Sequence, residues 1–141
     1  MKNKLFFSSI CILIICFTLS GCANDKTEAN IWENAVYDSD TEFGTGAKSI
    51  TVDVVTNEKS ITFTVNTDKS TVGEALIEHN LIEGEKGAYG LYVKKVNGIE
   101  ADYDKTQTFW AFCKNGESLM TGVDSEEAVD GSHYEFVYTK Q

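Results

Sequence analysis

Two stretches of alternating apolar and polar residues follow one another closely near the middle of the chain. The apolar positions are Ile50, Val52 and Val54 in the first stretch and Ile61, Phe63 and Val65 in the second. A period of two is typical of a β-strand with one buried face. A short polar segment, residues 56–59, separates the two stretches. The pattern therefore predicts a β-hairpin.

The spacing of the apolar residues changes after position 70. Thr71 and Glu74 have the spacing of a capping box, in which each side chain satisfies a free amide at a helix N-terminus. Val72, Ala75 and Leu76 then form one apolar stripe, which predicts a helix that ends near Asn80. The glycine-rich, charged residues 83–87 are expected to form a loop.

Period-two patterns return in the second half of the chain. Strands are predicted over residues 91–96 and 109–114, and a final strand is predicted around residues 134–138. Asn97-Gly98 and Asn115-Gly116 are strong signals for tight hairpin turns. The second of these turns is expected to return the chain alongside residues 109–114.

The predicted order is strand, strand, helix and then three or more strands. One helix on one face of a mainly antiparallel sheet is an α+β solution. A β-grasp-like arrangement fits this order best. An immunoglobulin-like sandwich is the alternative, and the capped helix argues against it.

The N-terminus has the features of an export signal. Lys2 and Lys4 precede an apolar run, residues 5–19, that is shorter than the roughly 20 residues needed to span a bilayer as a helix. The run ends in Leu-Ser-Gly-Cys at residues 19–22, which resembles the lipobox of bacterial lipoproteins. We therefore expect a signal peptide at 1–21, a lipid on Cys22, an acidic tether over 22–47 and a domain over 48–141. The protein would face outside the cytoplasm, anchored to the cell membrane by this lipid.

The charge of the chain limits its partners. The formal net charge is −10, and removal of the signal with Lys2 and Lys4 makes it −12; the chain contains no arginine. Nucleic-acid binding needs a basic surface, so this class of function is excluded. The remaining partners are the membrane, through the lipid on Cys22, and either a small-molecule ligand or an envelope protein.

Few residues offer catalytic or metal chemistry. Cys113 is the only cysteine left in the predicted mature domain, and its place in an apolar strand pattern indicates a buried, inert thiol. His79 and His133 are isolated, and no histidine or cysteine spacing suits a metal. Residues 38–42 resemble half a calcium loop, but Phe43 and Ser49 occupy the positions that an EF-hand gives to glycine and glutamate. We predict a binding module with no catalytic residue, no metal site and no required cofactor.

The C-terminal half also carries a family resemblance. Its motifs are the segment 92–98, Phe109-Trp110 with Phe112, the segment 119–124 with Gly122-Val123-Asp124, and Asp130-Gly131 before the last strand. As an ordered set they resemble the C-terminal domain of transcobalamin and intrinsic factor, and most closely bacterial lipoproteins with a transcobalamin C-terminal-like domain. The resemblance covers about residues 48–140. It implies a β-grasp-like fold and a ligand such as cobalamin, without the separate helical domain that holds most of the ligand in the animal carriers.

Matching of these motifs gives five candidate ligand-binding residues: Tyr92, Trp110, Phe112, Leu119 and Met120. Trp110 and Phe112 share one face of their predicted strand, and one face of that strand must pack on the core. Trp110 is therefore either a core residue or part of a binding surface. Two functions stay open, a module that binds cobalamin or a related small ligand and a cell-surface module that binds a protein or polymer.

Overall fold

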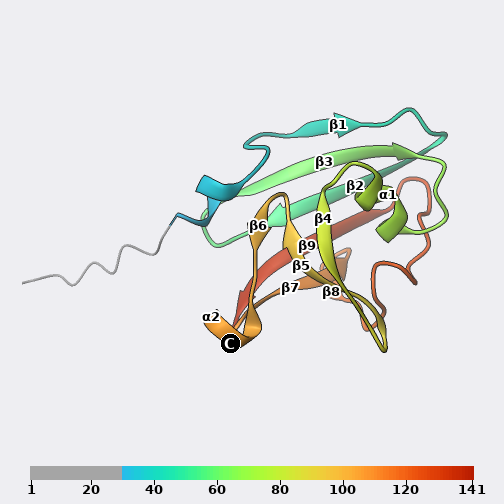
Figure 1. Ribbon diagram of the computed structural model, residues 1–141. Coiled ribbons are helices and arrows are strands. Elements are labelled where there is room, and N and C mark those ends of the chain that lie inside the picture. Colours follow the sequence, from blue (N-terminus) through green and yellow to red (C-terminus); the bar gives the residue numbers. More distant parts are fainter. Residues whose placement is uncertain (1–29) are drawn as a thin grey trace, which may run out of the picture.

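The computed structural model describes residues 30–141 (Figure 1). The predicted signal peptide and the lipid attachment site at Cys22 lie outside these residues. The elements are η1 (Ile31–Asn34), β1 (Thr41–Phe43), β2 (Lys48–Val55), β3 (Ser60–Thr67), α1 (Val72–Glu78), β4 (Ile82–Gly87), β5 (Gly90–Val96), β6 (Ile99–Glu100), α2 (Tyr103–Thr106), β7 (Thr108–Lys114), β8 (Glu117–Ser118) and β9 (His133–Lys140). No helix within 30–141 has the length and apolar character needed to cross a membrane.

The strands form a large sheet and a small one. The large sheet has six strands in the order β1-β3-β2-β9-β7-β8, and the small one has three in the order β4-β5-β6. In the large sheet, β2 is antiparallel to β3 but parallel to β9, and β1 is parallel to β3; all other neighbours in both sheets are antiparallel. The prediction of an α+β fold is confirmed, with a large sheet that is mixed because it contains two parallel pairs.

The core lies on one face of the large sheet. The inward residues of the predicted hairpin, with Tyr134 and Phe136 of β9, are almost completely buried. Leu76 from α1 and Val96 and Ile99 from the small sheet belong to the same apolar cluster. Both α1 and the small sheet lie in front of the large sheet in Figure 1. The helix therefore shares the covering of this face with a second layer of strands, which the sequence patterns did not predict.

The local signals around the helix and the two turns are confirmed. The Glu74 amide donates to Thr71 Oγ1 at 3.2 Å and the Thr71 amide donates to Glu74 Oε2 at 3.3 Å, which completes the predicted capping box. Asn97-Gly98 and Asn115-Gly116 all have positive φ, as a type I′ hairpin turn requires.

The prediction of a loop after α1 was wrong. Residues 83–87, expected to be a loop, belong to β4, which pairs with β5 along its length. Glycines, charged residues and an irregularity between Glu83 and Gly84 hid this strand from a reading based on apolar periodicity.

The domain also begins before position 48. The described part of the predicted tether contains β1, which pairs with β3. The rings of Tyr37 and Phe43 pack edge-on against Phe63, with centroids 5.7 and 5.5 Å away. Residues 37–43 are therefore part of the folded unit, because their aromatic rings cover the edge of the core.

Candidate functional site

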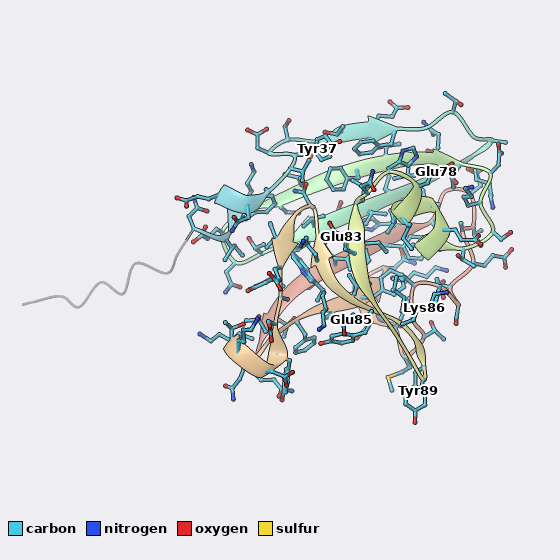
Figure 2. All side chains as sticks on the ribbon, in the orientation of Figure 1. Tyr37, Glu78, Glu83, Glu85, Lys86 and Tyr89 are labelled. Atoms are coloured by element: carbon cyan, nitrogen blue, oxygen red, sulfur yellow. The ribbon has the colours of Figure 1, made fainter. Side chains whose placement is uncertain are left out.

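The most exposed large apolar side chains of the described chain lie on two neighbouring segments. Tyr89, at the turn between β4 and β5, is 99% exposed, and Met120, in the connection between β8 and β9, is 100% exposed. Figure 2 shows Tyr89 at the outer end of the hairpin, pointing away from the body of the domain. Leu119 precedes Met120 and is half-buried. We call Tyr89, Leu119 and Met120 the tip surface.

A carboxylate joins the two segments that carry the tip surface. Asp124 Oδ2 accepts a hydrogen bond from the Leu91 amide at 3.1 Å. A Cβ built on Gly90 would lie 2.5 Å from Asp124 Oδ1, and one on Gly122 would lie 3.0 Å from the same atom. A side chain at Gly90, where φ is +104°, would displace the carboxylate, whereas one at Gly122 would require the carboxylate to shift by only a few tenths of an ångström. The Gly122-Val123-Asp124 motif thus fixes the position of the β8–β9 connection against the hairpin.

The same motif is also attached to α1. The Gly73 amide donates to the Val123 carbonyl at 2.8 Å, and the Val72 amide donates to the Glu126 carbonyl at 2.9 Å. These amides belong to the first turn of the helix, whose N–H groups have no partner within the helix. Val123 itself is buried. The connection that presents Met120 is therefore held from two sides.

Ion pairs brace the surrounding strands. Lys114 Nζ lies 2.8 Å from Glu126 Oε1 and 5.2 Å from the centre of the Tyr134 ring. The hydrogen bond to Glu126 raises the pKa of Lys114 above its ordinary value, which favours the charged form of the lysine. On the hairpin, Lys94 pairs with Glu85 at 3.0 Å and Lys95 pairs with Glu83 at 3.3 Å. Figure 2 places Glu83 and Glu85 along the hairpin above its tip.

Trp110 lies in the core, which settles the alternative that the sequence left open. It is only 6% exposed. Its indole N–H donates to the Ile99 carbonyl at 3.1 Å, and its ring packs edge-on against Tyr138 with centroids 5.1 Å apart. The ring therefore joins the small sheet to the large one and has no free face for a ligand.

The other four candidates divide between core and surface. Phe112 is partly buried, and its ring stacks on Tyr134 and Phe136 with centroids at 5.7 and 5.2 Å. Tyr92 is 47% exposed and lies on β5, opposite Glu85. Leu119 and Met120 belong to the tip surface. The structure therefore brings together two of the five predicted residues, and it adds Tyr89, which the motif comparison missed although an isolated tyrosine in a Gly-Ala-Tyr-Gly turn is a signal of an exposed ring.

The remaining polar candidates have structural partners. Asp40 Oδ1 accepts a hydrogen bond from the Thr62 amide at 2.8 Å, and Glu42 Oε1 accepts one from the Asn66 side chain at 2.8 Å. These two carboxylates of the acidic run 38–42 therefore bind to strand β3. Residues 30–141 contain no group of three or more His, Cys, Asp or Glu side chains placed to hold a metal ion.

His133 has charged neighbours and Cys113 is buried, while the buried Nε2 of His79 has no hydrogen-bond partner within the described residues. His133 lies between Asp53, at 2.9 Å, and Glu135, at 3.7 Å, on the face of the large sheet opposite the core. His79 borders a polar cavity of about 560 Å³ beside the end of β3. Cys113 is buried, and burial raises the pKa of its thiol, which keeps the thiol in its unreactive protonated form.

Comparisons with known proteins place the chain among its relatives. No curated protein matches it. A crystal structure from Ruminococcus gnavus ATCC 29149, described as a "putative metal binding protein", superimposes with a TM-score of 0.63 at 35% identity and covers 67% of this chain and 98% of its own. Haptocorrin in complex with Cbi superimposes with a TM-score of 0.56 at 20% identity over 70% of this chain. This chain spans only 26% of haptocorrin, so that similarity concerns the fold of one part of haptocorrin.

A family profile also matches the C-terminal half. It is described as a domain of unknown function, DUF4430, and it matches residues 69–140, which include α1, both hairpin turns and the whole Gly122-Val123-Asp124 motif. Together with the R. gnavus protein, this match shows that the chain belongs to the DUF4430 family.

Proposed function

We propose that the protein is a non-enzymatic binding module that holds a small ligand with an extended apolar face, such as cobalamin or a related compound, on its tip surface. The observation that carries the proposal is the complete exposure of Met120 and Tyr89 on segments that are otherwise firmly held. Exposed apolar side chains are common singly, but grouped on a fixed support they are typical of binding surfaces.

The rigid backbone beneath the tip surface favours ligand binding. A ligand that meets a rigid surface loses less conformational entropy from the protein than one that must order a loop. Asp124 and the first turn of α1 hold the backbone next to Met120, while the methionine side chain itself remains free to adjust. Methionine is well suited to such a position because its flexible thioether fits irregular apolar shapes.

The comparisons support the class of ligand. Haptocorrin, which shares this fold over part of its length, was crystallised with Cbi. Because this chain corresponds to about a quarter of haptocorrin, we propose that it contacts one side of such a ligand and that a second protein holds the other side. The R. gnavus relative is described in terms of metal binding, so divalent cations belong in the binding tests.

The strand order supports a β-grasp-like assignment for the fold. Two antiparallel strands, β3 and β2, precede the helix, and the last strand, β9, enters the sheet between β2 and β7 and runs parallel to β2. A central last strand that is parallel to the first strand of the N-terminal hairpin is what we expect of this fold.

We also propose that the protein is a lipoprotein anchored through Cys22 and facing away from the cytoplasm. The basic start, the short apolar run and Leu-Ser-Gly-Cys support this. Mass spectrometry of the protein from membranes tests it. A diacylglyceryl modification on Cys22, lost together with membrane association in Cys22→Ala, is the expected result, and an unmodified Cys22 in membrane-associated protein would contradict it.

The ligand proposal is tested by isothermal titration of the protein with cobalamin, Cbi and divalent cations in separate runs. We expect binding of a corrinoid that weakens at least about tenfold, a loss of 1.4 kcal/mol, when Tyr89 and Met120 are both changed to serine. Tyr103→Ser is the matched control, because Tyr103 is an exposed tyrosine on α2, away from the tip surface. Equal binding by the wild type and the double variant would reject the tip surface as the site.

A second function, recognition of a protein or polymer at the cell surface, has one observation in its favour. The outer edge of β4 has no strand partner within the described residues, and an extended chain can add to such an edge. Envelope extracts passed over the protein test it. A specific partner that binds the wild type, and no longer binds after Lys86→Pro in β4, would favour this function over a corrinoid ligand; Lys86 pairs with Leu91, whose amide donates to Asp124 and not to β4.

A further inference from the structure

A second cavity lies at the opposite end of β9 from the tip surface. Its volume is about 610 Å³, and it is lined by η1, the turn between β2 and β3, the junction of α2 with β7, and the last residues of β9. Figure 1 shows α2 and the C-terminus on the other side of the molecule from the β4–β5 turn. Small-molecule sites usually have volumes of about 300–1,000 Å³, so the cavity has a suitable size.

The cavity has an apolar floor with a fixed aromatic ring. Ile31 and Tyr138 contribute apolar surface. The Tyr138 ring is held edge-on by the buried Trp110. A tyrosine ring fixed in this way offers stacking area to a ligand at little cost in side-chain entropy.

Most hydroxyls around the cavity already have partners within the protein. Thr56 Oγ1 accepts the indole N–H of Trp32 at 2.9 Å, and Thr106 Oγ1 donates to the Asp102 carbonyl at 2.7 Å. The Tyr138 hydroxyl and the Asn57 amide, by contrast, make no hydrogen bond with other side chains or backbone groups of residues 30–141. These groups are therefore available to a ligand.

The charges at the cavity balance. Glu58 and Lys140 both line it, and neither forms an ion pair within the described chain. One acid and one base give the cavity no net charge, while the protein as a whole carries −10 and repels anions. The lining therefore suits a neutral molecule that has both a ring and hydrogen-bonding groups.

We propose that this cavity is a second ligand site, independent of the tip surface, and that it binds a neutral ring compound bearing hydroxyl or amide groups. The ring of the ligand stacks on Tyr138, and its polar groups bond the Tyr138 hydroxyl and the side chain of Asn57. A glycoside with an aromatic group has this chemistry.

Nuclear magnetic resonance titration of the protein with phenyl β-D-glucoside tests the site. We expect saturable shifts of the Thr56 and Thr139 amides with a Kd of about 1 mM or lower. Methyl β-D-glucoside, which lacks the ring, and benzoate, which carries a negative charge, are expected to bind at least about tenfold more weakly. Saturable shifts that instead map to Tyr89 and Met120, or no saturable shift at all, would overturn the proposal.

Tyr138→Phe separates binding from folding, because it keeps the ring that packs on Trp110 and removes only the hydroxyl. We expect it to weaken binding about three- to tenfold, the value of one uncharged hydrogen bond, with unchanged thermal stability. Tyr92→Phe is the control, since Tyr92 lies on β5 outside the cavity. Equal affinity in the wild type and in Tyr138→Phe would contradict the assigned role of the hydroxyl and with it the site.

Discussion

Two groups of large side chains from the C-terminal half of the chain have opposite environments. Trp110 and Phe112 on β7 point to the core, where one donates to the Ile99 carbonyl and the other stacks on Phe136. Tyr89 and Met120, at turns beyond the strands, are almost completely exposed. In these two groups, the aromatic residues in the register of β7 pack in the core, whereas Tyr89 and Met120 at turns are not covered by the rest of the domain.

The comparison also separates stability from binding. Core residues contribute through buried area and through the cavity that their loss would leave. Tip residues make few contacts within the domain, so their loss should change affinity with little effect on folding. Substitutions in the core, around Asp124 and at the tip surface test this separation, and their expected effects on stability decrease in that order.

The largest effect is expected for Trp110→Ala. Removing a buried tryptophan costs about 3–5 kcal/mol, and it also leaves the Ile99 carbonyl without its donor. Urea denaturation followed by circular dichroism measures the change. A loss below about 1 kcal/mol, as for a typical surface substitution, would mean that Trp110 is not a core residue.

A smaller effect is expected for Gly90→Ala. Gly90 has φ of +104°, and a Cβ there would lie 2.5 Å from Asp124 Oδ1, so we expect a loss of about 1–3 kcal/mol. Gly116→Ala is the matched control, since its φ is +83° and no atom lies within 4 Å of a Cβ. Its loss should be nearer about 1 kcal/mol, from the backbone alone. Equal losses would show that the carboxylate of Asp124 is not held in place.

Asp124→Ala should cost about 1–2 kcal/mol, because the Leu91 amide loses a charged acceptor. Its distinctive result is faster hydrogen exchange at Leu91, with amides in the centre of the large sheet unchanged. Asp124→Asn keeps an acceptor oxygen and should restore most of the protection. If Leu91 exchanges at the same rate in all three proteins, Asp124 does not join the two segments.

The smallest effect on stability is expected for Tyr89→Ser and Met120→Ser. Each should change the free energy of unfolding by less than about 0.5 kcal/mol, since both side chains are almost completely exposed. Thermal denaturation measures this. A loss above about 1 kcal/mol for either would mean that the residue packs within the domain and does not form a free surface.

The sequence predicted the parts of the fold that have local causes. The first hairpin, the helix cap at Thr71 and the two Asn-Gly turns depend on neighbouring residues, and all are present. It missed β4 because that strand is exposed, contains glycines and charges, and is stabilised by pairing with β5. Non-local pairing also explains β1, whose three residues join the large sheet through β3.

The candidate site was predicted only in part, for a similar reason. Leu119 and Met120 were identified from the motif, but the motif does not indicate which face of β7 is buried. That depends on the small sheet, which covers Trp110 and contributes Ile99 as its partner. Tyr89 was missed because its proximity to the segment with Met120 arises from contacts around Asp124 and Gly90, far apart in the sequence.

The most direct test measures the Kd of a corrinoid for two variants. One variant changes a core residue and the other changes the tip surface. We expect Trp110→Phe to lose stability but to keep the Kd within about threefold, and the double variant Tyr89→Ser with Met120→Ser to keep its stability but to raise the Kd at least about tenfold. Both values come from isothermal titration at a temperature where each variant is folded. An unchanged Kd in the tip variant together with a large loss in Trp110→Phe would contradict the assignment of the tip surface as the ligand site.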